Sequence, residues 1–336
     1  MRMRILIVSQ MWPSRHDPDL GAFLVPHVEA LRALGHEVTV VAIDRRGSSP
    51  LRYPGLTARA LLAAARSRPD VVLAHMLFPA GAAGLVAART ARCPLVVMAH
   101  GQDVVNLDRP KLLKVTARVV DRSAAVVCGS RWLAGRLRER LPACEPQIAG
   151  LGVDVDLLDP ARVTPAVWPG DHPRLLCIGS LSERKNVVAL ADAFGRLEGG
   201  SLVFVGDGEL RSQLEHRERV TVTGVVAHAE VAGWIAAADV VCQPSLAEPF
   251  GIAALEAMAL ARPVLVSANG GAAEFVPPQA GVVVDPTDGA AIESGLRAAI
   301  AIGTPCAAAR AAAQQRSAEL EAQRFAEILA EAIAGR

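Results

Sequence analysis

The sequence predicts an α/β protein built from two doubly wound parallel-sheet domains. Short β-branched runs alternate with longer segments of helical periodicity, and the runs are almost continuously apolar, as in sheets that helices cover on both faces. The alternation stops in a stretch rich in Pro, Gly and Asp (150–173) and then starts again. At 336 residues, the chain also exceeds the size at which a single core keeps growing.

The strands expected in the first domain are RILIVS (4–9), EVTVVAI (37–43), DVVLAH (70–75), PLVVMAH (94–100) and AAVVCGS (124–130). Those expected in the second are RLLCIGS (174–180), SLVFVGDG (201–208), VTVTG (220–224), DVVCQPS (239–245), PVLVSANGG (263–271) and GVVVDP (281–286). We place the domains at 1–165 and 166–336. We expect the Ala-rich terminal helix, about 318–334, to pack back on the first domain.

The composition indicates an ordered globular protein. Apolar residues make up 51% and charged residues 21%, which argues against disorder, and the net charge of +1 argues against wholesale binding of nucleic acid. Residues 1–165 hold 22 Lys+Arg against 14 Asp+Glu (+8), and residues 166–336 hold 13 against 20 (−7), which sum to +1. Much of the excess lies in 109–140. This basic region predicts either solvated helix faces or a peripheral contact with an anionic membrane or an anionic substrate.

Cysteine usage and the N-terminus indicate the compartment. The six cysteines show no CxxC spacing and several lie in apolar runs, so we expect buried thiols in a reducing environment. The N-terminus lacks the apolar region of a signal peptide, and no run of about 18 apolar residues predicts a spanning helix. We expect a cytoplasmic protein, which the region 109–140 would allow to associate with the cytoplasmic face of a membrane.

Polar residues gather where the predicted strands end. They are His75, His100 to Asp103, Ser130, Ser180, Asp207, Ser245 and Asn269. In doubly wound sheets, ligands bind outside the carboxyl ends of the strands. A central cleft between two facing domains would collect these side chains.

Lys185 is a candidate phosphate ligand. The chain has three lysines against 32 arginines, yet GSLSERKN (179–186) places a lysine between a predicted strand and a predicted helix. A compact ammonium at a helix N-terminus binds phosphate well. A plain surface lysine is the alternative, and the position at a strand end favours the functional interpretation.

The sequence lacks the motifs that would indicate a dinucleotide cofactor, a P-loop nucleotide site or a metal ion. Gly206-x-Gly208 follows a strand, but Arg211 stands where a dinucleotide fingerprint needs its third glycine, and no GxxxxGK[ST] occurs. No HxxxH or HExxH spacing predicts a metal site. Asp154 and Asp156 form a D-V-D pair in the predicted linker, where turn capping is favoured over metal binding.

Two glutamates stand eight positions apart in EPFGIAALE (248–256). Glu248 follows a predicted strand, Pro249 can begin a helix, and Gly251 lets a ligand approach the backbone. The first helical turn then offers N–H groups to an anion. Because carboxylates accept hydrogen bonds from vicinal hydroxyls, Glu248 and Glu256 together suggest a nucleotide sugar, with solvated helix residues as the equally weighted alternative.

The stretch PSLAEPFGIAALEAMALARPVLVSANGGAAEFV resembles the ExxxxxxxE signature of the retaining glycosyltransferases of family 4, whose fold is GT-B. Supporting segments stand in the family's order: GAFLVPHVEALRALGHEVTVV (21–41), MAHGQD (98–103), GLGVDVDLLDP (150–160), GSLSERKN, VGDGELR and WIAAADVVCQPS. The opening, SQMWPSRHDPDLGAFLVPHVEAL, is similar to the branch with teichuronic-acid and other surface-polysaccharide transferases. The resemblance covers nearly the whole chain. It implies two Rossmann-like domains facing a cleft, the first for the acceptor and the second for the nucleotide sugar.

The resemblance also implies roles for matching residues. Glu248 would bind hydroxyls of the donor sugar, His100 would lie beside that sugar, and Lys185 would neutralise the diphosphate. Around the nucleotide, Glu256 would bind the ribose, Gly21 would leave room for the diphosphate, and the backbone of Phe250, Gly251 and Ile252 would face the sugar and diphosphate.

Two positions depart from the family's pattern. Many members carry Arg directly after the first glycine of the GSLSERKN segment, where this chain has Ser180. Arg184 could take over that contact, or donor affinity could fall. Ala261 stands where the family usually has Gly, which affects only the local turn.

These observations predict a metal-independent, retaining hexosyltransferase. It would move a hexose-type sugar from a nucleotide-diphosphate sugar to a hydroxyl of a lipid-linked or cell-surface glycan, or of a small natural product. The nucleotide sugar is a substrate, so no cofactor is expected. Two alternatives stay open: a nucleotide-sugar 2-epimerase of GT-B shape, which needs no acceptor, and a non-catalytic sugar-nucleotide binder, which Ser180 would allow.

Overall fold

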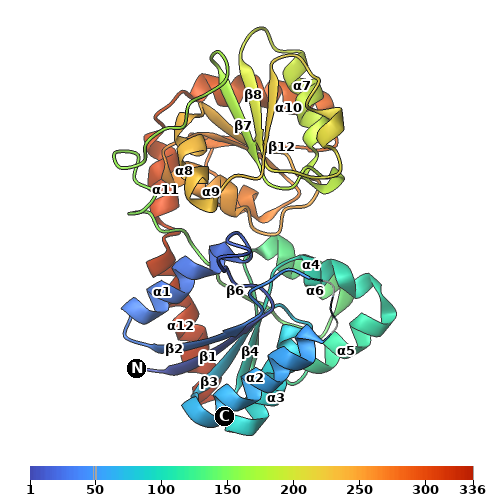
Figure 1. Cartoon of the computed structure of the whole chain (residues 1–336), viewed down its shortest axis with the longest axis vertical. Coiled ribbons are helices and arrows are strands. Elements are labelled where there is room, and N and C mark those ends of the chain that lie inside the picture. Colours follow the sequence, from blue (N-terminus) through green and yellow to red (C-terminus); the bar gives the residue numbers. More distant parts are fainter. Residues whose placement is uncertain (48, 50, 336) are drawn as a thin grey trace. The chain divides into compact units, whose positions relative to one another are not determined.

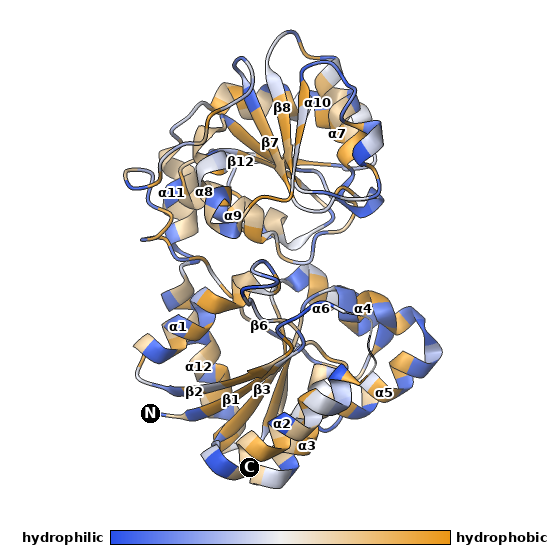
Figure 2. Ribbon diagram, viewed as in Figure 1, coloured by the Kyte–Doolittle hydropathy of each residue, from blue (hydrophilic) through white to orange (hydrophobic). Residues whose placement is uncertain are grey.

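The apolar runs of the sequence form two parallel six-stranded sheets, one in each of two units (Figure 1). The computed structural model describes residues 1–47, 49 and 51–335. Unit 1 comprises Met1–Gly152 and Ala318–Arg336, and unit 2 comprises Val153–Ser317. Figure 2 shows hydrophobic residues along the strands of both sheets, as expected when helices cover both faces.

The sheet of unit 1 has the order β2-β1-β3-β4-β5-β6 with all neighbours parallel. Chain order reverses between β1 and β3, where Ser9 lies opposite His75. The strands are β1 Arg4–Ser9, β2 Glu37–Ala42, β3 Val71–His75, β4 Leu95–Ala99, β5 Ala125–Cys128 and β6 Gln147–Ile148. The first five match the predicted runs. The two-residue β6 was not predicted, because so short a pairing leaves no periodic signal.

Helices cover the two faces of this sheet with side chains from alternate strand positions. One face packs α2, α3, α5 and α6, and the other packs α1 and α12, including Phe325 and Leu329. The helices are α1 Val25–Ala33, α2 Arg52–Ser67, α3 Ala80–Ala91, α4 Gln102–Val105, α5 Pro110–Val120, α6 Arg131–Arg140 and α12 Ala318–Ala334, with 3₁₀ turns at Ala22–Leu24 (η1) and Asn106–Asp108 (η2). The terminal helix α12 thus belongs to the core of unit 1.

The sheet of unit 2 has the order β12-β11-β10-β7-β8-β9, again parallel throughout, and its order reverses between β7 and β10. The strands are β7 Arg174–Ile178, β8 Ser201–Val205, β9 Val220–Gly224, β10 Val240–Gln243, β11 Val264–Ser267 and β12 Gly281–Val284. The helices are α7 Val187–Gly195, α8 His228–Ala237, α9 Ile252–Ala259, α10 Gly289–Ile302 and α11 Ala307–Gln314, with 3₁₀ turns at Glu183–Lys185 (η3), Arg211–Gln213 (η4) and Gly271–Glu274 (η5). One face packs α7 and α10, and the other α8, α9 and α11.

The boundary between the units lies at Gly152/Val153 rather than at 165/166, where the sequence analysis placed it. The reason is that the Pro-rich stretch is not a free linker: Val153, Leu158 and Val163 pack into an apolar cluster of unit 2. Arg310 of α11 fixes this stretch by donating to the carbonyl oxygens of Val155 (2.7 Å) and Leu158 (2.8 Å).

Smaller expectations can also be compared with the structure. Asp154 caps a turn, since its Oδ1 accepts from the N–H groups of Asp156 and Leu157. The described cysteines form no disulfide, and all but Cys93 are buried. Within the described residues, no helix combines the length and apolar character that crossing a bilayer requires.

Candidate active site

The switch point of unit 2 brings together residues that follow β7 and β10. Lys185 in η3 after β7 places Nζ 2.7 Å from Oε2 of Glu248, which follows β10, and 3.2 Å from Oε1 of Gln243. Both charged side chains are mostly buried, with 13% of Lys185 and 15% of Glu248 exposed. The sequence analysis predicted separate roles for these two residues, and the structure joins them in one ion pair where doubly wound folds bind ligands.

Glu248 is held firmly by its own backbone. Its N–H donates to the carbonyl oxygen of Asn269 (3.1 Å), and its carbonyl oxygen accepts from Gly271 (2.9 Å). Gly270 is required there, because a Cβ at this position would lie 2.6 Å from the Glu248 carbonyl oxygen. The Glu248 carboxylate engages Lys185 and Ser245 through Oε2, so Oε1 has no partner within the described residues.

Arg184 stands beside this pair. Its Nη1 donates to the carbonyl oxygen of Ala247 (3.0 Å) and lies 4.0 Å from Glu248 Oε2. Ser180, where the family resemblance led us to expect Arg, is exposed, and its hydroxyl lies 3.3 Å from the Ser182 hydroxyl. Arg184 is therefore a second cation close to Glu248, after Lys185.

Helix α9 begins later than Pro249, where the sequence placed its start. Gly251 is the N-cap residue, with φ of 97°, and the first helical residue is Ile252. A Cβ on Gly251 would lie 2.7 Å from that of Ala272, so both the positive φ and the close approach require glycine. Phe250 packs against Phe275 at 5.6 Å between ring centroids. No side chain caps the first turn of α9.

Glu256, one turn into α9, is not in contact with the Lys185–Glu248 pair. It lines a cavity of about 580 Å³ within unit 2, whose walls are the segment 157–166, the first turns of α8 and Ile235. Burial raises the pKa of its carboxyl group to about 7, and the residue as a whole is partly buried. The two glutamates therefore have different neighbours: Glu248 contacts Lys185, and Glu256 lines the cavity beside α8.

Gly206 and Gly208 serve chain packing. A Cβ at Gly206 would lie 2.0 Å from the Gly179 carbonyl oxygen, and one at Gly208 would lie 2.5 Å from that of Leu181. The backbones of the loops after β7 and β8 are in direct contact. This contact explains why both positions are glycine, so a dinucleotide-binding role is not needed to account for them.

The switch point of unit 1 holds a second group of predicted residues. Gly21 precedes η1 with φ of 69°, and a Cβ there would lie 3.0 Å from Met11 of the loop after β1. Phe23 of η1 approaches the ring of His100 (centroids 5.7 Å apart), and His100 Nε2 lies 3.0 Å from Nδ1 of His75, the last residue of β3. The structure thus brings Gly21 and His100 to the same edge of the unit 1 sheet.

Buried Asp103 fixes the backbone around His100. Its Oδ1 accepts from the N–H groups of His100, Gly101 and Val104, and its Oδ2 accepts from Leu77 (2.9 Å). Burial raises the pKa of this carboxyl group against the effect of these bonds. Burial lowers the pKa of His100 to about 4, so the ring is uncharged near neutral pH.

Two family models match the chain, one on each side of the unit boundary. The model described as Glycosyltransferase Family 4 matches residues 23–157, and the model described as Glycosyl transferases group 1 matches residues 172–302. The chain belongs to the family 4-like glycosyltransferases. Both switch points described above fall inside or beside the matched segments of this glycosyltransferase.

Curated relatives extend along most of this glycosyltransferase. It is 25% identical to the teichuronic acid biosynthesis glycosyltransferase TuaC of Bacillus subtilis, over 88% of each chain. It is 28% identical to glycogen synthase of Mycobacterium tuberculosis, over 96% of this chain and 92% of the relative.

Solved structures show the same GT-B fold. Sucrose-phosphate synthase from Thermosynechococcus elongatus matches with a TM-score of 0.80 at 20% identity, over 99% of this chain and 100% of that one. Anabaena HepE in complex with UDP-glucose matches with a TM-score of 0.73 at 19% identity, over 98% and 100%. The prediction of two doubly wound sheets in a GT-B glycosyltransferase is thus confirmed.

Sequence reasoning missed several residues of this glycosyltransferase's site. Gln243 contacts Lys185, and Asn186, with φ of 56°, ties the loops after β10 and β12 together through the carbonyl oxygens of Pro244 and Pro286. His27 lies behind His75, which the sequence analysis had already placed at a strand end and which contacts His100. A polar residue inside an apolar strand was an available signal for Gln243, whereas His27 lies on a helix without any motif. In the part of the chain that the structure describes, no three His, Cys, Asp or Glu side chains are grouped to hold a metal ion.

Proposed function

We propose that this glycosyltransferase moves a hexose-type sugar from a nucleotide-diphosphate sugar to a hydroxyl acceptor, with retention at the anomeric carbon and without a metal ion. The observation that carries the proposal is the Lys185–Glu248 pair at the switch point of unit 2. It offers a cation for phosphate and a carboxylate for sugar hydroxyls at one place.

The leaving diphosphate would be stabilised by fixed positive charge. An ammonium has three N–H donors, and Lys185 uses two of them on Gln243 and Glu248, so one is available for a phosphate oxygen. The uncapped first turn of α9, from Ile252 onward, adds backbone N–H groups and the positive end of the helix dipole. Arg184 is the further cation at this edge. Preorganised charge of this kind acts on the transition state without reorganising.

The nucleoside would occupy the cavity lined by Glu256. The cavity lies on the α8 side of α9, and a carboxylate at its edge can accept hydrogen bonds from both ribose hydroxyls. The family resemblance gives Glu256 the same role. The complex of HepE with UDP-glucose makes UDP-glucose the first donor to try.

The hydroxyls of the donor sugar would be bound by Glu248 of unit 2. The open Oε1 of Glu248 suits a sugar hydroxyl, whereas its Oε2 is neutralised by Lys185. A carboxylate in an ion pair is a weak nucleophile, so double displacement through Glu248 is disfavoured. We therefore favour attack on the same face as the departing diphosphate, which would take the acceptor proton.

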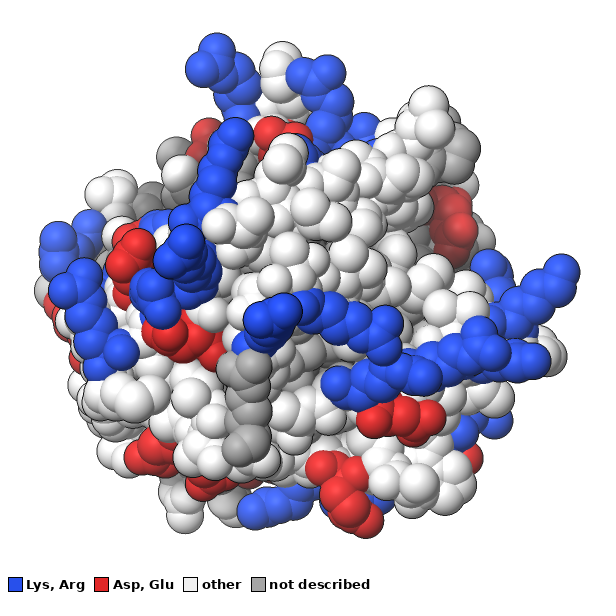
Figure 3. Space-filling view, turned by 90° about the horizontal axis from the view of Figure 1, so that it is seen from below, with Lys and Arg blue, Asp and Glu red and all other residues white. Residues whose placement is uncertain are grey.

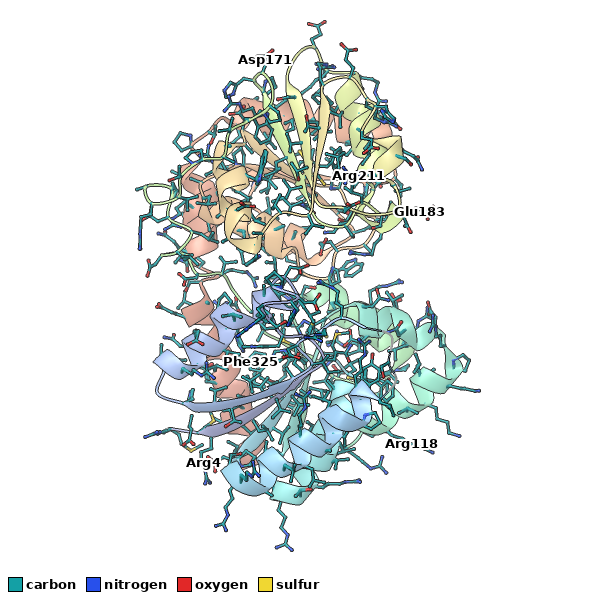
Figure 4. All side chains as sticks on the ribbon, in the orientation of Figure 1. Arg4, Arg118, Asp171, Glu183, Arg211 and Phe325 are labelled. Atoms are coloured by element: carbon teal, nitrogen blue, oxygen red, sulfur yellow. The ribbon has the colours of Figure 1, made fainter. Side chains whose placement is uncertain are left out.

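The acceptor would be a glycan, as the names of TuaC and glycogen synthase suggest for those relatives. The basic residues of helix α5 favour a glycan acceptor that is bound to a membrane. Lys111, Lys114 and Arg118 are exposed along one side of α5, and no ion pair of theirs is recorded within the described residues. Arg118 is labelled in Figure 4, and Figure 3 shows Lys and Arg side chains standing out from the surface. Arg136, Arg138 and Arg140 of the same basic region instead pair with acids.

Binding of UDP, GDP, ADP and dTDP without metal, measured by calorimetry, tests the donor site. We expect saturable binding of one nucleotide, lost in Glu256→Ala and kept in Glu198→Ala, an exposed glutamate of the same unit. NMR of the product anomer tests retention. An inverted product, or no binding of any of the four nucleotides, would refute the proposal.

A further inference from the structure

Three histidines of unit 1 form one buried cluster behind the candidate site. His27 of α1 lies edge-on to His75, with ring centroids 6.3 Å apart, and His75 Nδ1 lies 3.0 Å from His100 Nε2. Phe325, labelled in Figure 4, closes the far side of His27 with centroids 4.9 Å apart. Both ring nitrogens of His27 and Nε2 of His75 are buried without a partner in the described part of the chain, while His100 is partly exposed. The cluster therefore opens to solvent only through His100.

Burial limits the protons that the cluster can hold. It lowers the pKa of His27 to about 3, that of His100 to about 4 and that of His75 well below its usual value, so near neutral pH all three rings are uncharged. A neutral imidazole has one N–H donor and one bare, accepting nitrogen. Three rings thus bring three N–H donors into the cluster, and a buried donor without an acceptor destabilises the folded state.

The hydrogen bond between His75 and His100 can run in two directions. The direction decides which ring nitrogen carries the N–H that is not used in this bond. If His100 Nε2 donates to His75 Nδ1, the proton of His75 lies on Nε2, which is buried and has no partner. If His75 Nδ1 donates to His100 Nε2, the buried Nε2 of His75 is only an unused acceptor, and the proton of His100 lies on Nδ1. Buried acceptors are left unpaired more readily than buried donors, so the second direction is favoured.

We propose that His75 is a positioning residue that holds His100 in the Nδ1–H tautomer and makes it a hydrogen-bond donor toward the substrate. The inference rests on the proposed function only for the identity of the receiving atom, an oxygen of the donor sugar or of the acceptor. In this tautomer His100 carries no lone pair at Nδ1 and cannot act there as a base. The acceptor proton must then leave by another group, which agrees with its transfer to the departing diphosphate.

The tautomer can be read directly in the intact chain, without turnover. Long-range ¹H–¹⁵N correlation spectra of protein labelled with ¹⁵N-histidine separate protonated from bare ring nitrogens, and the variants His100→Gln and His75→Asn assign the two rings. At pH 7.5 we expect Nδ1–H for both His75 and His100. A signal for Nε2–H from His100 would overturn the proposal, whatever the donor or acceptor proves to be.

Two substitutions of His75 distinguish the effect of its N–H donor from the effect of its side-chain volume. Asparagine places an N–H close to the position of Nδ1, whereas leucine fills the space without a donor. In His75→Leu we expect His100 to lose its single tautomer, and kcat for release of UDP from UDP-glucose to fall about tenfold, the equivalent of one hydrogen bond, with KM unchanged. His75→Asn should recover most of kcat.

Equal kcat values in the folded leucine and asparagine variants would overturn the proposal. If His75→Leu does not fold, the wild-type spectrum decides alone. A chain that shows the Nδ1–H tautomer but binds no nucleotide would refute the proposed function and leave the assignment of His75 intact.

Discussion

At the switch point of unit 2, Lys185 and Glu248 meet as a charged pair 2.7 Å apart, whereas at the switch point of unit 1, His75 and His100 meet as uncharged rings 3.0 Å apart. Backbone hydrogen bonds hold the chain around Glu248, and the Asp103 carboxylate holds the chain around His100. The difference lies in what each edge can offer a ligand. Unit 2 can balance the charge of a phosphate, and unit 1 can direct a neutral hydrogen bond, so a reaction that releases a diphosphate depends most on unit 2.

Loss of the ammonium of Lys185 should have the largest effect. In Lys185→Ala we expect kcat/KM for UDP-glucose to fall about 10²–10³-fold, because the leaving diphosphate loses a preorganised cation. Arg89→Ala is the matched control, since it removes a cation from an exposed helix position of unit 1 that has no proposed role. A fall of less than tenfold in initial-rate assays would show that Arg184 and the first turn of α9 carry the charge without Lys185.

The basic side of α5 should give unit 1 a property that unit 2 lacks, namely binding to anionic membranes. Replacing Lys111, Lys114 and Arg118 together by glutamine should weaken binding to phosphatidylglycerol vesicles about 100-fold, since each surface charge contributes about 1 kcal/mol. The matched control replaces Arg136, Arg138 and Arg140, which are paired with acids. Vesicle co-sedimentation that responds equally to both triple variants would assign the effect to net charge rather than to α5.

Glu256 should make donor binding depend on pH. Its pKa is raised to about 7, and the ribose hydroxyls bond best to the ionised form, so affinity for UDP-glucose should rise up to about tenfold between pH 6 and pH 8. The diphosphate of this donor does not titrate in that range. Glu256→Gln should bind weakly at both pH values, and calorimetry showing the same pH dependence in the variant would contradict the assignment.

The same residue should destabilise unit 2 at alkaline pH. Because the pKa of Glu256 is raised in the folded state above its usual 4.5, its contribution to stability is present below pH 4.5 and is lost as the pH rises toward about 7. Glu256→Gln should therefore raise the free energy of unfolding at pH 8 by up to about 3 kcal/mol and leave it nearly unchanged at pH 4.5.

The histidines of unit 1 should give the opposite pH dependence of stability, with a smaller effect than Glu256. Burial lowers the pKa of His27 from 6.5 to about 3, so its contribution is present above pH 6.5 and is lost as the pH falls below it. At pH 5 the free energy of unfolding is lowered by about 2 kcal/mol through His27. His27→Leu removes this loss and two unpartnered ring nitrogens. Denaturant unfolding should show less loss of stability between pH 7.5 and pH 5 in the variant, and an unchanged loss would place the acid sensitivity in His75 and His100.

The fold could be predicted from the sequence because its signals are local. Each of the longer strands is a short apolar run, and Lys185 and Glu248 were found because each directly follows such a run. Their pairing could not be predicted, since it depends on β10 lying beside β7 with two strands between them in sequence. The start of α9 was misplaced because Gly251 adopts a left-handed conformation that no helical pattern reveals.

The surroundings of Glu256 could not be predicted for a similar reason. Eight residues of spacing fix where the two glutamates lie along the chain, but the wall of the Glu256 cavity comes from the segment 157–166 of unit 2, which is distant in sequence. Because this segment packs within unit 2, the unit boundary lies at Val153 rather than at the predicted position. A Pro-rich composition indicates irregular backbone and says little about which neighbour that backbone joins.

Helix α12 makes unit 1 discontinuous, and this sets an order of folding during synthesis. Unit 2 is one uninterrupted segment, whereas the face of unit 1 formed by Ile5, Ile7 and Leu73 is covered partly by Phe325 and Leu329. Those two residues leave the ribosome only after all of unit 2. The unit whose strands are translated first can therefore complete its core last, and an arrested chain ending before residue 318 would expose apolar surface to chaperones.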